Sequence, residues 1–101
     1  MKVVLTDAAV ADLIRIGWFI REGNPARAVT FVAELEERCR NMEAAPHAYP
    51  LLPSHESAGI RRRPCRDYLI FYRVNEAGGV VEILHVLHGA RDYEEVLFSG
   101  A

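Results

Sequence analysis

The sequence has few of the features that indicate a particular chemistry. Its two cysteines, Cys39 and Cys65, form no CxxC pair, and neither lies at zinc-finger spacing from a histidine. No stretch matches a phosphate-binding loop, a nucleophile elbow or a zinc-protease motif. We therefore expect neither a metal nor a cofactor, and we interpret both cysteines as small, buried, apolar residues.

Long hydrophobic runs and a large excess of charge are also absent. The first helical pattern already carries Asp12, Arg15 and Glu22, so the N-terminal region has neither an uncharged signal core nor a membrane span. A net charge of -2 argues against bulk electrostatic attraction to nucleic acid, although it leaves a local cationic patch open. We expect a cytoplasmic protein that does not enter a membrane.

The remaining composition is typical of one globular domain. Half of the 101 residues are hydrophobic and 26% are charged, as in folded rather than disordered proteins. A chain of this length can remove roughly 60 to 70% of its unfolded surface from water, which is enough to fold without disulfides or metal. We expect a single domain over residues 1–101.

Two strands joined by a glycine turn form the centre of the predicted fold. Residues 68–74 and 80–87 are rich in aromatic and branched side chains, which pack well in a pleated sheet. Gly78 and Gly79 between them favour an antiparallel hairpin. Both strands are apolar on both faces, as in the middle of a sheet. Helices can cover one face only, so we expect the other to remain a hydrophobic patch for a partner chain.

Two helices precede this hairpin. Residues 2–5 are β-prone, Thr6 can cap a helix that ends at Gly23, and Asn24-Pro25 can open a second helix. The predicted core-facing residues of the two helices are Ala9, Leu13, Ile16, Ile20, Ala28, Phe31 or Val32, Leu35, Cys39 and Met42, and Val10, Ile14 and Gly17 are expected to widen the stripe of the first helix. Asp12 is expected to lie off this stripe, and Trp18 to lie in the core or in an interface.

A proline-rich loop over residues 46–57 leads from the helices to a further strand over residues 59–66. Pro64 predicts an irregularity in that strand. Residues 92–98 suit a short helical turn or a docked tail. The element order β-α-α-β-β-β plus a tail predicts an α+β domain in which an αα-hairpin packs on a small antiparallel sheet.

Cationic residues supply the candidate binding surface. Strand alternation places Arg61 and Arg63 on one face of the sheet and Arg62 on the other. Guanidinium groups suit phosphate and carboxylate, but a solvated strand that resists edge aggregation is an equally good interpretation. Arg91 leaves the end of the last strand, where it either recognises a target or forms an ion pair with Asp92 or Glu94.

The four histidines give no metal site. His85 and His88 are three apart in an extended segment and so lie on opposite faces, which argues against a shared metal ion. His47 and His55 lie in the loop, with no ligand partner at suitable spacing. A hydrogen-bonded histidine is the simpler interpretation of the strand pair.

Taken together, these motifs resemble the ParE branch of the RelE/ParE toxin superfamily over nearly the whole chain. The resemblance rests on Ala9-x-x-Asp12-Leu13-x-x-Ile16, Asn24-Pro25, Gly59-x-Arg61, residues 68–74 and the closing residues 83–92. It implies a cytoplasmic toxin of a type II toxin–antitoxin system. Such a toxin binds and inhibits DNA gyrase without acting as an enzyme, and a ParD-like ribbon-helix-helix antitoxin neutralises it in a hetero-oligomeric complex.

The RelE branch of the same superfamily is the alternative, because its members cut mRNA on the ribosome. That activity implies an arginine in the central strand and a catalytic tyrosine or histidine in the tail. Here Leu69 stands nearest to the arginine position, and the tail has Glu95, Val96 and Leu97 where the ring is expected. Tyr93 or His88 could be recruited as the proton-transfer group that RNA cleavage needs.

We expect no catalytic residue in the favoured interpretation. The residues expected to bind the target or the antitoxin are Arg61, Arg63, Arg73, His88, Arg91 and Tyr93.

Overall fold

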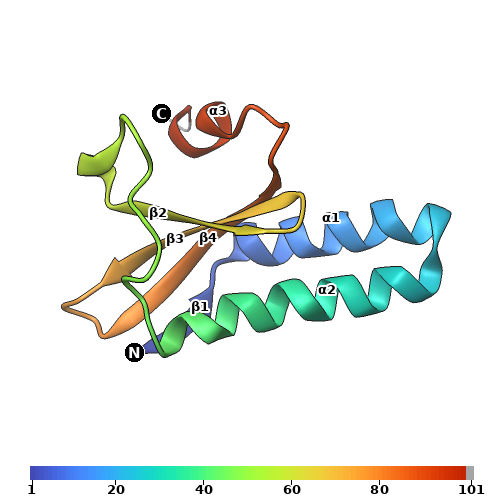
Figure 1. Cartoon of the computed structure of the whole chain (residues 1–101), viewed down its shortest axis with the longest axis horizontal. Coiled ribbons are helices and arrows are strands. Elements are labelled where there is room, and N and C mark those ends of the chain that lie inside the picture. The colour runs from blue at the N-terminus through green and yellow to red at the C-terminus, as the bar shows by residue number, and fades with distance from the viewer. Residues whose placement is uncertain (100–101) are drawn as a thin grey trace.

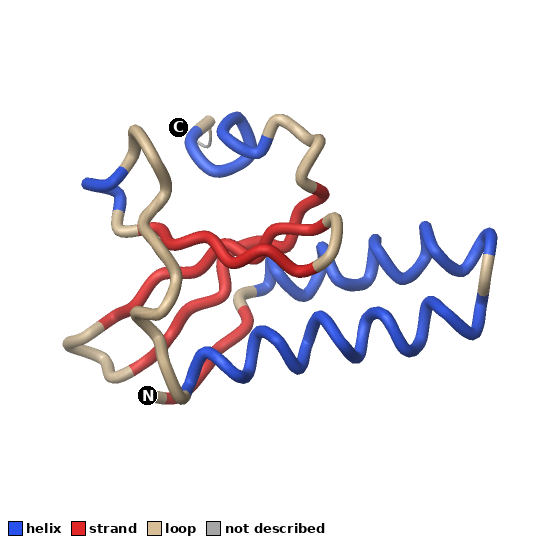
Figure 2. Tube along the Cα trace, viewed as in Figure 1, coloured by secondary structure: helices blue, strands red, loops and turns tan. Residues whose placement is uncertain are grey.

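A computed structural model describes residues 1–99, in which an αα-hairpin packs on one face of a four-stranded sheet (Figure 1, Figure 2). The elements are β1 (Lys2–Leu5), α1 (Asp7–Gly23), α2 (Pro25–Arg40), β2 (Ile60–Cys65), β3 (Tyr68–Asn75), β4 (Val80–His88) and α3 (Tyr93–Phe98), with 3-10 turns at Asn41–Glu43 and Glu56–Ala58. The expected α+β class and element order are confirmed. The expected domain, residues 1–101, extends over two residues that lie outside the described part.

The sheet has the strand order β1-β4-β3-β2. β2, β3 and β4 pair antiparallel, as the sequence predicts, but β1 pairs parallel with β4, with Lys2 opposite Val80 and Leu5 opposite Ile83. The sheet is therefore mixed. No short turn joins β1 to β4, and so no hairpin geometry imposes an antiparallel pairing on them.

The sheet has one irregularity among the described residues, but it does not lie at Pro64, where the sequence predicts it. Pro64 pairs in regular register with Leu69, and β2 is an edge strand, where a missing backbone N–H is tolerated. The register instead shifts between β3 and β4, where Phe71 pairs with His85 and Tyr72 pairs with Ile83. One residue of β4 is extra at this point, which is the mark of a β-bulge.

The main core lies between the sheet and the helical hairpin. The Thr6 side chain caps α1 by accepting the Ala9 N–H at 3.2 Å, and Asn24 caps α2 by accepting the Arg27 N–H at 3.0 Å. The buried residues of this core include Ala9, Leu13, Ile16, Phe31, Leu35, Cys39, Met42, Ile70, Tyr72, Val81 and Ile83. The predicted stripes on both helices are thus confirmed for these positions.

The chain itself covers the second face of the sheet, so the open hydrophobic patch predicted there is wrong. Phe71 and Leu87 are buried by Leu52 from the loop and by Tyr93, Val96 and Leu97 from the tail. Figure 1 shows this loop and α3 on the side of the sheet opposite to α1 and α2. A sequence pattern shows that a strand face is apolar but not which distant segment will cover it.

Two loop residues help to hold this cover in place. The His55 ring lies 2.6 Å from the Glu94 carboxylate and stacks on Phe98 with centroids 4.3 Å apart. His47 lies 2.8 Å from the carboxylate of Glu76. His47 and His55, which received no role from the sequence, therefore make short contacts with carboxylates that link the loop to the β3–β4 turn and to the tail.

Both cysteines are buried, as predicted. Burial raises the pKa of the Cys39 thiol to about 12, and it also raises the pKa of Cys65. These thiols are therefore uncharged core residues at neutral pH. Within residues 1–99, no helix combines the length and the hydrophobicity that crossing a bilayer requires.

Candidate functional site

A buried carboxylate joins α1 to the end of β4. Asp12 is only 4% exposed, contrary to the expectation that it lies off the core stripe. Its Oδ2 accepts the Val86 N–H at 2.9 Å and lies 2.8 Å from His85 Nδ1, and its Oδ1 accepts from Arg15 at 3.0 Å. Both carboxylate oxygens of Asp12 therefore have hydrogen-bond partners. A buried charge is tolerated when it is paired and hydrogen-bonded in this way.

The bulge in β4 makes this arrangement possible. A regular ladder would direct the Val86 N–H toward β3, whereas a bulged strand leaves a backbone group available to a side chain. The sequence does hold a signal, because Asp12 lies three residues after Ala9 and four before Ile16, both of which are core positions. A carboxylate on an apolar stripe predicts a buried partner rather than a solvated one.

The side chains of Arg61 and Arg63 point toward the helical side of the sheet, where each donates a hydrogen bond to a backbone carbonyl. Arg61 donates to the Tyr49 carbonyl at 2.7 Å, and Arg63 donates to the Arg38 carbonyl at 2.8 Å. The Arg63 guanidinium also lies over the Tyr49 ring at 4.9 Å. The two cations therefore tie the loop and the end of α2 to β2.

Tyr93 and Arg62 meet on the opposite face. Arg62 donates to the Tyr93 hydroxyl at 2.9 Å, and the Tyr93 ring packs on Phe71 with centroids 5.0 Å apart. This contact confirms that Arg62 lies on the other face from Arg61 and Arg63. It also makes Tyr93 part of the second core.

Arg73, His88 and Arg91 are exposed. The Asp92 carboxylate caps α3 by accepting the Glu95 N–H at 3.3 Å, and Glu94 pairs with His55, so the ion pair considered for Arg91 does not form. Within residues 1–99, Arg91 forms no ion pair with any carboxylate. His88 packs edge-on against Tyr68, with centroids 5.2 Å apart.

Among the six predicted site residues, the structure brings together two pairs: Arg61 with Arg63, both of which contact Tyr49, and His88 with Arg91. His88 and Arg91 line a recess between α1 and the exit of β4. Arg73 belongs to β3 and pairs with Ile60 of β2 and Glu82 of β4. Among the described residues, no cluster of three His, Cys, Asp or Glu side chains could hold a metal ion.

An apolar groove runs along β1, α1 and α2, and the sequence did not predict it. The expectation that Val10 and Ile14 widen the core stripe of α1 is wrong, because both are exposed in this groove. The volume of the groove is ≈ 970 Å³. Val4, Val10, Ile14, Trp18 and Val29 line it and are all exposed. On α1 the three exposed residues recur every four positions, which places a second apolar stripe beside the core stripe.

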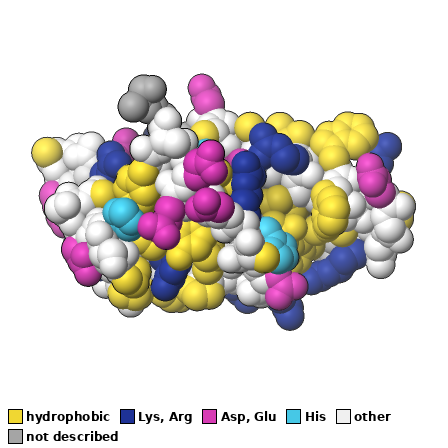
Figure 3. Space-filling view, turned by 90° about the horizontal axis from the view of Figure 1, so that it is seen from above, with side chains coloured by type: hydrophobic (Ala, Val, Ile, Leu, Met, Phe, Trp, Pro, Cys, Tyr) yellow, Lys and Arg dark blue, Asp and Glu magenta, His cyan; other side chains and the backbone are white. Residues whose placement is uncertain are grey.

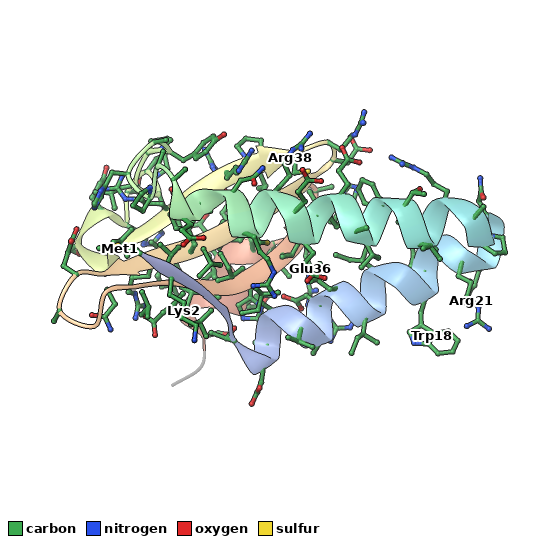
Figure 4. The ribbon with its side chains drawn as sticks, turned by 90° about the horizontal axis from the view of Figure 1, so that it is seen from below. Met1, Lys2, Trp18, Arg21, Glu36 and Arg38 are labelled. Atoms are coloured by element: carbon green, nitrogen blue, oxygen red, sulfur yellow. The ribbon has the colours of Figure 1, made fainter. Side chains whose placement is uncertain are left out.

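The charges around this groove are mostly positive. Lys2, Arg21 and Arg40 line it with one acid, Glu36. Figure 4 shows Lys2 at the β1 end, Glu36 in the C-terminal half of α2, and Trp18 and Arg21 together toward the far end of α1. The Arg21 guanidinium lies 4.4 Å from the centroid of the Trp18 ring. The groove is thus an apolar trough with a cationic rim.

The face on the other side of the molecule has a different character. Figure 3 shows Lys and Arg side chains next to Asp and Glu side chains there, with hydrophobic side chains between them. Such a surface has no extended field of one sign, in agreement with the net charge of -2.

The chain is similar in sequence and in fold to known toxins. A family model described as the ParE toxin of type II toxin-antitoxin system, parDE, matches residues 3–93. No curated protein sequence matches the chain. A chain of the chromosomal ParDE system from P. aeruginosa has 22% identity and a TM-score of 0.75, over 87% of this chain and 95% of that one.

Two further solved structures share the fold. A chain of the toxin–antitoxin complex RelBE2 from Mycobacterium tuberculosis has 25% identity and a TM-score of 0.65, over 86% of this chain and 95% of its own. A YoeB/ParE toxin from Agrobacterium tumefaciens has 22% identity and a TM-score of 0.61, over 87% of this chain and 98% of its own.

Proposed function

Because this chain belongs to the ParE toxin family of type II toxin–antitoxin systems, we propose that it binds and inhibits DNA gyrase in the cytoplasm, without acting as an enzyme. We further propose that a ParD-like ribbon-helix-helix antitoxin neutralises it in a hetero-oligomeric complex. The single observation that carries the antitoxin half of this proposal is the apolar groove of β1, α1 and α2.

The groove has the chemistry of a site for an amphipathic helix. Contiguous apolar surface of this kind marks an interaction site, and a helix docks in such a trough through residues spaced three or four apart. Ile14 is 57% and Val29 74% exposed, so the chain alone leaves them in water. The three cations on the rim favour an antitoxin segment with acidic flanks.

Binding to the target is assigned to three exposed side chains that form no ion pair within residues 1–99. Arg91, His88 and Arg73 are exposed and available to a second protein. Arg61, Arg63 and Tyr93 already hold the loop, the end of α2 and Arg62. We propose that these three shape the surface around the target, whereas the first three contact it.

The internal role of Tyr93 supports inhibition by binding rather than by RNA cleavage. General acid–base cleavage needs a proton donor and a proton acceptor placed on either side of one phosphate. The Tyr93 hydroxyl lies against Arg62 on one face of the sheet, and His88 packs against Tyr68, which contacts Phe31 on the other face. The rings of Tyr93 and His88 therefore lie on opposite faces of the sheet, so they are not placed on either side of one phosphate.

The test is a pair of assays on the same purified toxin. We expect it to inhibit supercoiling by purified gyrase and to leave mRNA intact on translating ribosomes. If mRNA is cleaved instead, and cleavage is lost in Tyr93→Phe or His88→Gln, the RelE-like ribonuclease becomes the function. Gyrase inhibition that is unchanged in Tyr93→Phe would exclude the Tyr93 hydroxyl as a catalyst, whereas His88→Gln should weaken inhibition, because His88 is proposed to contact the target.

A further inference from the structure

The recess between α1 and the exit of β4 is a second candidate binding site. Its volume is ≈ 260 Å³, and residues from α1, β3, β4 and the exit loop line it. None of them lines the apolar groove. The recess is therefore separate from the surface assigned to the antitoxin.

The recess has an apolar floor with an exposed aromatic wall. Ile16, Val86 and Leu87 form the buried part, each 7% exposed or less. Phe19 stands beside them and is 73% exposed. A ligand that covers Phe19 removes apolar surface from water, which favours binding.

The only acid in the recess is already neutralised. Both oxygens of Asp12 are occupied by Arg15, His85 and the Val86 N–H. Arg15 uses one nitrogen for this contact, and its side chain is otherwise 63% exposed. An incoming ligand therefore meets cationic donors rather than a free carboxylate.

His88 and Arg91 add two further donors. The His88 Nδ1 accepts the Ala90 N–H at 3.1 Å, so the neutral ring carries its proton on Nε2 and can donate from there. Arg91 lines the same recess and has no ion-pair partner within residues 1–99. The combination of a free guanidinium fork and an imidazole N–H suits one carboxylate.

We propose that this recess binds a single carboxylate of a protein partner together with the hydrophobic side chain next to it. Arg91 and His88 hold the carboxylate, while Phe19 and Tyr68 cover the hydrophobic side chain. The size of the recess points to a peptide, because pockets for whole ligands measure roughly 300 to 1,000 Å³. This inference deepens the proposed function, on which it rests, by giving Arg91 a class of ligand on the target.

The test uses the full-length toxin and four probes. Three are acetylated peptides: one with Phe-Glu and an amidated end, the same peptide with Phe-Gln, and one that ends in Phe with a free carboxylate. The fourth is inorganic phosphate. Amide NMR shifts report the affinity and the place of binding. We expect the Phe-Glu peptide to bind at least tenfold tighter than the Phe-Gln peptide and to shift Phe19 and His88.

Substitutions assign this preference to the recess. Arg91→Gln should remove the tenfold preference, and Arg27→Gln, which changes an exposed arginine of α2 outside both the recess and the groove, should preserve it. Tighter binding of the free-carboxylate peptide would support the same site with a chain terminus as its source. Equal binding of the Glu and Gln peptides, or a stronger response to phosphate than to any peptide, would overturn the proposal.

A gyrase supercoiling assay separates this inference from the proposed function. A wild-type toxin that leaves gyrase active but shows the preference that depends on Arg91 refutes the gyrase proposal and supports the carboxylate site. A toxin whose inhibition of gyrase is unchanged in Arg91→Gln supports the gyrase proposal and overturns the assignment of the recess to the target.

Discussion

The carboxylate of Asp12 on α1 accepts the backbone N–H of Val86 on β4 at 2.9 Å, across 74 positions of sequence. The contact fixes the first helix against the last strand at the point where that strand bulges. Because the recess that contains Arg91 begins at the same place, the geometry of the candidate target site depends on this hydrogen bond.

Asp12→Ala should lower the free energy of unfolding by roughly 2 to 4 kcal/mol, because it leaves the buried Val86 N–H without a partner. Asp12→Asn should cost less, since its carbonyl oxygen can still accept that N–H. Urea unfolding measures both. Glu22→Ala on the exposed side of α1 is the control, and we expect it to stay within about 0.5 kcal/mol of wild type. A similar loss in both alanine variants would contradict a specific role for Asp12.

Arg91→Ala should relieve growth arrest while leaving the melting temperature nearly unchanged. Exposed charges seldom contribute more than about 1 kcal/mol to stability, whereas removing an interface arginine commonly costs roughly 2 kcal/mol of binding, or about 30-fold in affinity. Growth of cells that express each variant at equal level, together with thermal unfolding of the purified proteins, measures the two effects.

Arg61→Ala is the matched control for Arg91→Ala, and its expected effects are reversed. It removes the hydrogen bond to the Tyr49 carbonyl, so it should destabilise the fold by about 1 to 2 kcal/mol. Full arrest by Arg91→Ala, combined with loss of toxicity in a stably folded Arg61→Ala, would move the target site from the exit loop to β2.

Ile14→Asp should abolish binding of the antitoxin without unfolding the toxin. The side chain is 57% exposed, so a charge there costs the free chain little, but it places a carboxylate in the middle of the apolar groove. Co-purification with the cognate antitoxin and thermal unfolding check the two halves. Phe19→Asp provides the comparison, because Phe19 lies in the recess and should leave the antitoxin bound.

The stability of the fold should fall as the pH rises above 9. Burial raises the pKa of Cys39 from 9.0 to about 12, so between these values the unfolded chain loses the thiol proton while the folded chain keeps it. This contribution is complete below pH 9 and is lost progressively up to about pH 12. From pH 9 to 10 it amounts to about 1 kcal/mol. Urea unfolding should show a smaller decrease in Cys39→Ala over this range; identical pH profiles would contradict the assignment.

The elements of this fold could be predicted from sequence because they depend on local patterns. Thr6 and Asn24-Pro25 mark helix starts, and the glycines at 78 and 79 mark a turn, each through its own backbone preference. The partners of Asp12 could not be predicted in the same way, since His85 and Val86 lie 73 and 74 positions away.

The candidate surfaces were predicted less well for a related reason. Leu52 and the tail cover the second face of the sheet, and the groove appears only once β1, α1 and α2 lie together. Among the predicted cations, sequence alternation separated Arg62 from Arg61 and Arg63. It could not show that Arg61 and Arg63 would be used on backbone carbonyls. Exposure of Arg91 follows from tertiary structure, not from the pattern around it.

The parallel pairing of β1 with β4 also sets when the toxin can first exist during its synthesis. Lys2 pairs with Val80, 78 positions later. At a synthesis rate of about 5 to 20 residues per second, the strand that pairs with β1 is made roughly 4 to 16 s after β1 itself. Until then α1 and α2 have no complete sheet to pack on, and the exit loop with Arg91 has not been made. The apolar stripes of the two helices therefore stay exposed for this interval, and the surface proposed to contact the target forms only after β4 has been made.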